Sequence, residues 1–214
     1  KETIAQVKQQ AAEQIGLNPK ARAELPQGNA FLMVQFGGDT AEEADGAAQR
    51  MLEGLHESEH DADVAFLDDP THEDELWQVR EAGLGATAHV PNKAITWEGW
   101  EDSSVPPDRL GDYLRKLRQL LQQYEYEGDL YGHFGQGCVH TRINFDLETA
   151  EGIRTFHRFL HDAAKLVVSL GGSISGEHGD GQSKAELLPI MFGEELVEAF
   201  REFKQAWHPE NGLN

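Results

Sequence analysis

The segment YGHFGQGCVH, residues 131–140, carries two histidines that could bind a metal ion. His133 and His140 are separated by a stretch that contains Gly135 and Gly137. On a regular strand, two residues at this spacing face opposite sides of the sheet and lie about 23 Å apart. On a helix they lie two turns apart, about 10 Å. Both rings can therefore reach one ion only if the backbone folds between them, which glycine permits.

A second candidate segment is SISGEHGDGQSK, residues 173–184, where Glu177 and His178 are adjacent among glycines. Its glycine content disfavours helix and strand and indicates a loop, where functional side chains are often held. His133, His140 and Glu177 together would form a two-histidine, one-carboxylate metal site with open coordination positions, which suits catalysis. His178 would then act as an acid or base. The alternative is a mobile loop with surface side chains.

Two other histidine patterns favour simpler interpretations. HESEH, residues 56–60, matches the H-E-x-x-H pattern of zinc proteases, but its surroundings are polar and no third ligand follows in a supporting context. His157 and His161 are four residues apart on a predicted helix, and we expect no acidic ligand to join them. We interpret both patterns as solvated helix surface.

The composition limits the class of protein. The 214 residues suffice for one large domain or two small ones, and the net charge of −20 argues against a nucleic-acid or anionic-membrane surface. A small anionic substrate would need only a local basic pocket. The single cysteine, Cys138, excludes an internal disulfide, and no apolar run could span a bilayer. Because the chain starts at Lys1 and stops at WHPENGLN, we expect both ends to be cut.

The elements that must position these residues alternate between strands and helices. Strands are predicted at 30–38, 61–69, 97–106 and, interrupted by glycines, 130–145. Helices are predicted at 1–15, 39–55, 72–85, 107–126, 148–170 and 194–207. No strand is fully apolar, which indicates a sheet with one exposed face. The predicted class is α+β, an antiparallel sheet with helices packed mainly on one face.

Several stretches resemble one known family, the flavin-linked D-2-hydroxyacid dehydrogenases of the glycolate oxidase and D-lactate dehydrogenase group. YGHFGQGCVHTRINFDL is similar to the family motif GHxGDGNxH, and GGSISGEHGDGQSKAELLP is similar to GGxxSGEHGxG. FKQAWHPENGLN resembles the final stretch of the family, and LWQVREAG and DSSVPPDRL occur in the family's order. The segment HFGQGCVHTRI is most similar to large bacterial members that join flavin and iron–sulfur domains and resemble D-2-hydroxyglutarate dehydrogenases.

This resemblance implies a ferredoxin-like, C-terminal domain of an FAD-linked oxidase. Residues 1–29 would be a helix and linker leading from an FAD-binding domain that the chain lacks, and residues 30–214 a substrate-binding cap domain truncated at its C-terminal end. The implied activity is oxidation of a D-2-hydroxy acid, such as D-lactate, glycolate or D-2-hydroxyglutarate, to the 2-oxo acid. FAD would be bound mainly by the other domain, so the chain alone would be inactive.

The resemblance also implies residue roles at the metal site. His133, His140 and Glu177 match the family's ligands for a divalent metal, with zinc expected and manganese or iron as alternatives. The metal would bind the hydroxyl and carboxylate of the substrate and lower the pKa of the hydroxyl. His178 matches the base that takes the hydroxyl proton as hydride leaves for the flavin.

The residues expected to contact the substrate and the cofactor match the family pattern less closely than the metal ligands do. Arg80 matches the arginine that binds the substrate carboxylate, although it could equally be a surface arginine. Trp100 occupies the position of a lysine found in some relatives, so Arg142 or Lys184 could supply the missing positive charge. Asn214, in the family's final stretch, is expected to contact the cofactor.

Two further departures put the substrate preference in doubt. Gln136 stands where most relatives have aspartate, and Cys138 where they have asparagine. Cys138 shares a strand face with His140, so a thiolate ligand is a minor alternative.

The expected partners are an anionic 2-hydroxy acid, the FAD-binding domain of the same polypeptide, and an iron–sulfur domain or electron carrier. The expected location is the cytoplasm, with the inner face of the membrane as an alternative. Two rival hypotheses remain open on the residues alone. One is a free-standing His/His/Glu metalloenzyme, such as a non-haem iron oxygenase or a hydrolase, and the other is a non-catalytic regulatory domain that kept the fold.

Overall fold

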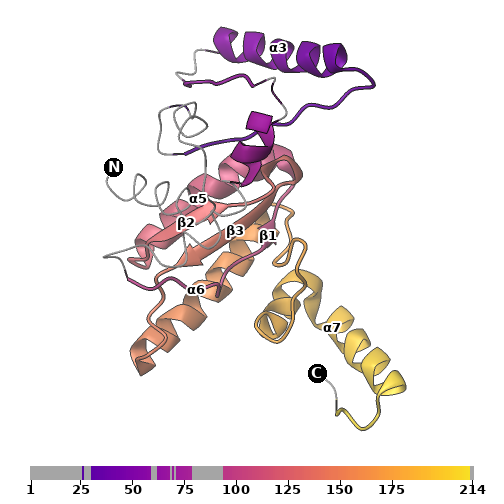
Figure 1. Cartoon of the computed structure of the whole chain (residues 1–214). Helices are drawn as coiled ribbons and strands as arrows, with labels where there is room; N and C mark the ends of the chain where they lie inside the picture. The colour runs from indigo at the N-terminus through magenta and orange to yellow at the C-terminus, as the bar shows by residue number, and fades with distance from the viewer. Residues whose placement is uncertain are drawn as a thin grey trace. The chain divides into compact units, whose positions relative to one another are not determined.

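The computed structural model describes residues 30–58, 62–67, 71–78 and 94–212, together with Pro26 and Asp69 (Figure 1). The chain divides into two compact units, Lys1–Asn92 and Lys93–Asn214. This boundary falls inside the region 30–214 that was predicted as one domain. The predicted helix at 1–15 lies outside the described residues, as do Arg80 and Asn214.

The first unit confirms one predicted helix and corrects two predicted strands. Helix α3 (Ala41–Glu57) begins at Thr40, whose hydroxyl accepts a hydrogen bond from the backbone N–H of Glu43. Residues 31–38 and 62–67 form no strand, so the strands predicted there are wrong. An alternating apolar pattern shows which side chains could face a core, but a strand also needs a hydrogen-bonded neighbour, which the pattern cannot supply.

Two other predictions fall at the edge of the described part of this unit. Residues 71–78 are helical and overlap with the predicted helix at 72–85, whose remainder is outside the described residues. The first residues of HESEH form the end of α3, where His56 is exposed, while Glu59 and His60 lie outside the described residues.

The second unit contains an antiparallel sheet in the order β1-β3-β2 (Figure 1). Its strands are β1 (Ser103–Ser104), β2 (Gly128–Tyr131) and β3 (Cys138–Ile143). Ser104 pairs with Cys138 of β3, and an isolated bridge from Ser104 to Ser173 extends the sheet beyond β1. With the two helices described next, the chain order becomes strand, helix, strand, strand, helix, followed by the bridging residue Ser173. This order matches the predicted ferredoxin-like fold, with the bridge at Ser173 in the place of its last strand.

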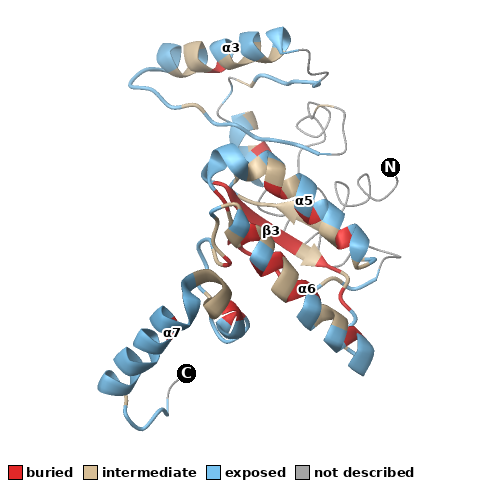
Figure 2. Cartoon of the chain, turned by 180° about the vertical axis from the view of Figure 1, so that it is seen from behind, coloured by how far each residue is buried: buried red, intermediate tan, exposed pale blue. Residues whose placement is uncertain are grey.

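Helices α5 (Leu110–Gln123) and α6 (Ala150–Ser169) contribute their apolar sides to the core of this unit. Figure 2 shows the buried residues along β3 and on these helices. The largest fully buried side chains of the core include Trp100, Tyr113, Phe159, Leu117, Ile143, Ile174 and Leu187. The α+β class predicted from the sequence is therefore confirmed.

The last helix, α7 (Leu188–Trp207), starts earlier than predicted and is interrupted at Gly193, whose φ of 77° is not helical. No helix in the described part of the chain is long and apolar enough to cross a membrane.

The segment between the two candidate metal-binding histidines is a hairpin, not the single bulged strand predicted at 130–145. Strands β2 and β3 run antiparallel, and Tyr131 pairs with His140. The short 3-10 helix η2 (Phe134–Gln136) connects them and ends at Gly137 in the left-handed conformation, with φ 75°. The spacing of two histidines could not distinguish a bulge from a complete reversal of the chain, because glycine permits both.

The two glycines of this turn are not equivalent. A β-carbon on Gly137 would collide with the backbone carbonyl of Val105, whereas a β-carbon on Gly135 would meet no atom within 4 Å. Gly137 also makes two backbone hydrogen bonds. Its N–H donates to Phe134 O at 3.0 Å, and its C=O accepts from Val105 N–H at 3.0 Å. The turn therefore depends on Gly137 and not on Gly135.

We expect Gly137→Ala to lower the free energy of unfolding by about 2–4 kcal/mol, from left-handed strain together with the steric clash. Gly135→Ala is the matched control and should change it by less than about 0.5 kcal/mol. Urea denaturation of the chain measures both values. Equal effects of the two substitutions would contradict this account of the turn.

Candidate active site

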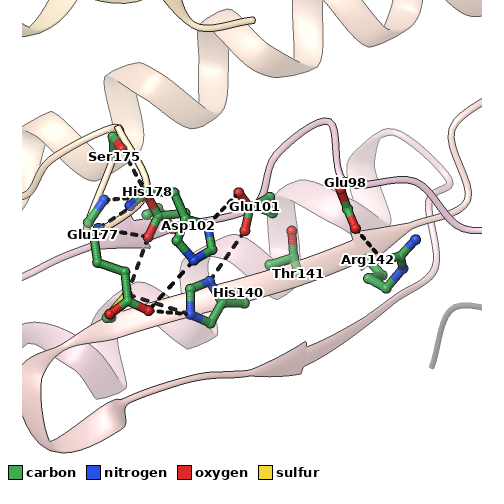
Figure 3. Close-up of polar contacts among 12 residues, drawn as sticks. Glu98, Glu101, Asp102, His140, Thr141, Arg142, Ser175, Glu177 and His178 are labelled. Carbon is green, nitrogen blue, oxygen red and sulfur yellow. Dashed lines mark hydrogen bonds and ion pairs between the residues drawn. The ribbon is translucent and has the colours of Figure 1, made fainter. Parts of the chain in front are cut away.

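Three imidazole rings surround one carboxylate oxygen in the second unit. Glu177 Oε1 lies 3.0 Å from His140 Nε2, 3.5 Å from His133 Nε2 and 3.8 Å from His178 Nε2. His133 belongs to the β2–β3 turn. His140 belongs to β3, while Glu177 and His178 come from the loop between α6 and α7 (Figure 3). The fold therefore brings together the four residues that the sequence selected as metal ligands and base.

The loop that carries Glu177 and His178 is anchored by Asp102, which sequence reasoning missed. The Asp102 carboxylate accepts hydrogen bonds from the backbone N–H groups of Gly176 (3.0 Å), Glu177 (2.9 Å) and His178 (2.8 Å), and from the Ser175 hydroxyl (2.9 Å). Figure 3 shows these bonds converging on one side chain. A glycine-rich loop that could not hold a fixed shape alone is thereby ordered around a buried anion.

The electrostatic consequence for Asp102 follows from the same contacts. Burial alone would raise the pKa of Asp102, but the backbone hydrogen bonds from His178 and Glu177 oppose it. With the Ser175 bond and the charge of Lys184, they lower the pKa to about 2. Asp102 is therefore ionised at neutral pH although none of it is exposed to solvent.

Lys184 is a buried residue that holds the backbone next to the site. Its ammonium group donates to the backbone carbonyls of Glu101 (2.5 Å), Asp102 (3.2 Å) and Ile174 (2.7 Å). The side chain is 5% exposed, and burial lowers its pKa. An ammonium has three N–H donors. These contacts therefore direct Lys184 to the backbone beside Asp102.

Glu101 is a second residue that sequence reasoning missed. Its Oε1 accepts a hydrogen bond from His178 Nδ1 at 2.8 Å, and its Oε2 lies 3.4 Å from His140 Nδ1. The hydrogen bond to Glu101 is the main cause that raises the pKa of His178. It also turns His178 Nε2 away from Glu101, which leaves that nitrogen available as a base. In the sequence, the only sign of Glu101 and Asp102 was that these two acids are adjacent in WEDSSVP, directly before a short buried strand.

Asp102, His140, Glu177 and His178 could together hold a divalent metal, because each offers one ligand atom within 4.8 Å of the others. His133 is not part of that group, although its Nε2 lies 3.5 Å from Glu177 Oε1. Neighbouring ligand atoms of a tetrahedral zinc site are about 3.3 Å apart, since Zn–N and Zn–O bonds are about 2.0–2.1 Å long. The rings of His133 and His140 have centroids 6.1 Å apart. His140 Nδ1 is buried without a hydrogen-bond partner in the described part of the chain, and its nearest carboxylate is Glu101. A ligating histidine with its other nitrogen facing a carboxylate is a common metal-site arrangement.

A pocket of about 340 Å³ opens beside these residues. It is lined by Ser104, His133, Gln136, Cys138, Gly176 and Glu177. Gln136 and Cys138, two of the departures from the family pattern, therefore line the pocket. Burial, and then the hydrogen bond to Asp102, raise the pKa of Cys138 to about 12, which disfavours a thiolate ligand.

The remaining predicted substrate residues are placed as follows. Arg142 lies on β3, and its Nη1 pairs with Glu98 Oε1 at 2.5 Å. Trp100, which stands in place of a lysine, is buried in the core and donates through Nε1 to the Tyr113 hydroxyl. Arg80 is outside the described residues, so its predicted contact with a carboxylate stays a prediction.

We expect Asp102→Asn to lower the free energy of unfolding by about 2–3 kcal/mol at pH 7, because an uncharged amide cannot accept from every donor of the loop. The exposed Asp108→Asn is the control and should cost less than about 0.5 kcal/mol. A lowered carboxylate pKa stabilises the fold above pH 4 and loses this effect as the pH falls towards 2. The difference between wild type and Asp102→Asn should therefore shrink between pH 5 and pH 2.5 in urea denaturation. A difference that is constant over this range would contradict the anchoring role.

Known proteins with similar sequences are D-2-hydroxyglutarate dehydrogenases and D-lactate dehydrogenases. D-2-hydroxyglutarate dehydrogenase of Haemophilus influenzae is 28% identical over 187 residues, which cover 85% of this chain and 18% of that protein. D-2-hydroxyglutarate dehydrogenase of Escherichia coli is 32% identical over 139 residues, 65% of this chain and 14% of that protein. D-lactate dehydrogenase of Archaeoglobus fulgidus is 37% identical over 113 residues, 53% of this chain and 25% of that protein.

The chain thus spans less than a fifth of the length of the D-2-hydroxyglutarate dehydrogenases that it matches. The family model for FAD linked oxidases, C-terminal domain, matches residues 2–214. This match includes both candidate segments, residues 131–140 and 173–184, and it agrees with the α+β fold and the site geometry. The chain belongs to the C-terminal domain family of the FAD linked oxidases.

Proposed function

We propose that this chain is the substrate- and metal-binding part of a flavin-dependent enzyme that oxidises a D-2-hydroxy acid to the 2-oxo acid. The observation that carries the proposal is the approach of three imidazole Nε2 atoms to one oxygen of Glu177. Family membership and the names of the relatives support this reaction over a free-standing oxygenase or hydrolase.

His133, His140 and Glu177 would hold a divalent cation, for which zinc, manganese and iron are all suitable with two nitrogens and one oxygen. When bound, the cation supplies a positive centre that polarises the substrate hydroxyl and lowers its pKa. The FAD-binding domain of a longer polypeptide supplies the hydride acceptor, and an iron–sulfur domain or another carrier would take the electrons onward.

The charge of the site supports the need for a cation. Glu101, Asp102 and Glu177 place three carboxylates around the rings, and the buried Lys184 is the ammonium that contacts the backbone between them. An anionic hydroxy acid would be repelled by these groups alone. A divalent ion reverses the sign of the local field where the substrate carboxylate and hydroxyl must bind.

His178 would take the hydroxyl proton at Nε2. Its Nδ1–H is held by Glu101, so the ring has a fixed tautomer and orientation, and the carboxylate stabilises the imidazolium that forms. Proton removal at the oxygen and loss of hydride from C2 together convert the alcohol into a carbonyl. The ring of His178 also stacks on His140 at 4.9 Å, which limits its rotation.

Two of the residues that line the pocket differ from the family motif. Gln136 and Cys138 line it, so they would contact or exclude the part of the substrate beyond C2. Arg142 would be a carboxylate partner if it exchanged Glu98 for the substrate. We therefore propose the substrate only as a class, a D-2-hydroxy acid.

We expect His178→Ala to keep the metal and to slow flavin reduction about 10²–10⁴-fold, the usual effect of removing a positioned acid or base. His140→Ala should bind one metal ion fewer and lose activity, because a three-ligand site depends on each ligand. Both are measured by metal analysis and by stopped-flow flavin reduction, in the protein that includes its FAD-binding domain. The exposed His56→Ala is the control and should behave as wild type.

The substrates for this experiment are D-2-hydroxyglutarate, D-lactate and glycolate, with the L-enantiomers of the first two as controls. No flavin reduction by any of them would contradict the proposed reaction. If His178→Ala instead loses the metal and reduces flavin normally once metal is restored, the roles of ligand and base are assigned wrongly.

A further inference from the structure

We infer that the second unit has another divalent-metal site, formed by His157, His161 and Glu186 on the surface of α6. From the sequence, we expected no acidic ligand to join these two histidines. In the structure, Glu186 of the 3-10 helix η3 (Ala185–Leu187) supplies that acid. One nitrogen from each ring and one Glu186 oxygen all lie within 4.8 Å of one another.

The contacts have the arrangement of a chelating site. His157 Nε2 lies 3.1 Å from Glu186 Oε1 and 3.3 Å from Oε2, and His161 Nε2 lies 3.9 Å from Oε1. The two rings have centroids 4.6 Å apart. Histidines at i and i+4 of a helix present both rings on one face, the spacing that zinc proteins use on helices. A carboxylate from another element then completes a two-histidine, one-carboxylate set.

The backbone under this cluster is held on both sides. On α6, Phe159, Leu160 and Ala164 are buried beside the histidines, and Leu187, next to Glu186, is not exposed at all. Lys184, two residues before Glu186, is fixed by its three carbonyl contacts. The ligands therefore project from anchored backbone, which reduces the entropy that binding must overcome.

A surface ion pair would explain Glu186 and one histidine but not the second ring on the same oxygen, and exposed ion pairs stabilise little. Zinc or a similar borderline metal suits two imidazoles and a carboxylate. The exposed fractions of the side chains are 55%, 33% and 50%, so an ion could enter and keep water in its open positions. The chain's net charge of −20 also favours cation binding.

Such an ion would clamp η3 to α6. η3 ends the segment that begins after α6 and carries Glu177 and His178. The clamp would thus fix the far end of that loop, opposite to its attachment at Asp102. The ion would stabilise the folded chain by mass action, because the unfolded chain does not assemble the three ligands.

The test is the number of Zn²⁺ ions bound by the 214-residue chain, measured by equilibrium dialysis with variants of each site. We expect two ions for wild type and one for His157→Ala/His161→Ala, with circular dichroism confirming that this variant is folded. Glu186→Gln should weaken binding of the second ion about tenfold or more. The control is Glu151→Gln, an exposed carboxylate on α6 that pairs with Arg154, and it should still bind two ions.

His140→Ala separates this inference from the proposed active-site metal. That variant should retain one ion, and Zn²⁺ should still raise its melting temperature; adding His157→Ala/His161→Ala should abolish both effects. If the double histidine variant binds as many ions as wild type, or if His140→Ala binds none, the α6 site does not exist. If instead His140→Ala binds as many ions as wild type while the α6 variant loses one, the α6 site stands and the proposed active-site metal is wrong.

Discussion

The active-site geometry depends on one buried carboxylate. Asp102 accepts hydrogen bonds from three consecutive backbone N–H groups and a hydroxyl of the loop that carries Glu177 and His178. A loop with this glycine content has a large conformational entropy to lose, and only strong, charge-assisted bonds can offset it. Asp102 itself has a φ of 64°, a left-handed conformation that aspartate tolerates better than most residues. The backbone at the centre of the site is therefore strained, and its hydrogen bonds compensate.

A second constraint is that the site gathers negative charge. Glu101, Asp102 and Glu177 converge, and Lys184 is engaged by backbone carbonyls. In the proposed function, such a site would bind a cation, and only with that cation present would it suit an anionic substrate. The same physical rule applies on α6, where Glu186 meets two imidazoles away from the pocket. Carboxylates shared between histidines thus recur in this unit, once in a cleft and once on a helix surface.

The hairpin shows how a small steric requirement sets the distance between the two proposed metal ligands His133 and His140. Gly137 adopts a left-handed conformation against the carbonyl of Val105, so the chain reverses after η2 and β3 returns along β2. His133 and His140 thereby approach each other from the turn and from the strand. The bulge expected between them would have served the same purpose, but reversal also provides the central strand of the sheet, which packs against the core helices.

The sequence by itself determined the class of fold and the helices α3, α5, α6 and α7. It also determined the four residues His133, His140, Glu177 and His178. Both results follow because amphipathic periodicity and short motifs depend only on residues that are close together in the chain. The strands predicted at 30–38 and 61–69 were wrong, since strand pairing depends on partners that local patterns do not reveal. Glu101, Asp102 and Glu186 became visible only in the tertiary structure, from 25 to 77 residues away from the groups that their carboxylates contact. A charged residue acquires its role from what the fold places within hydrogen-bonding distance, and no spacing along the chain specifies that distance.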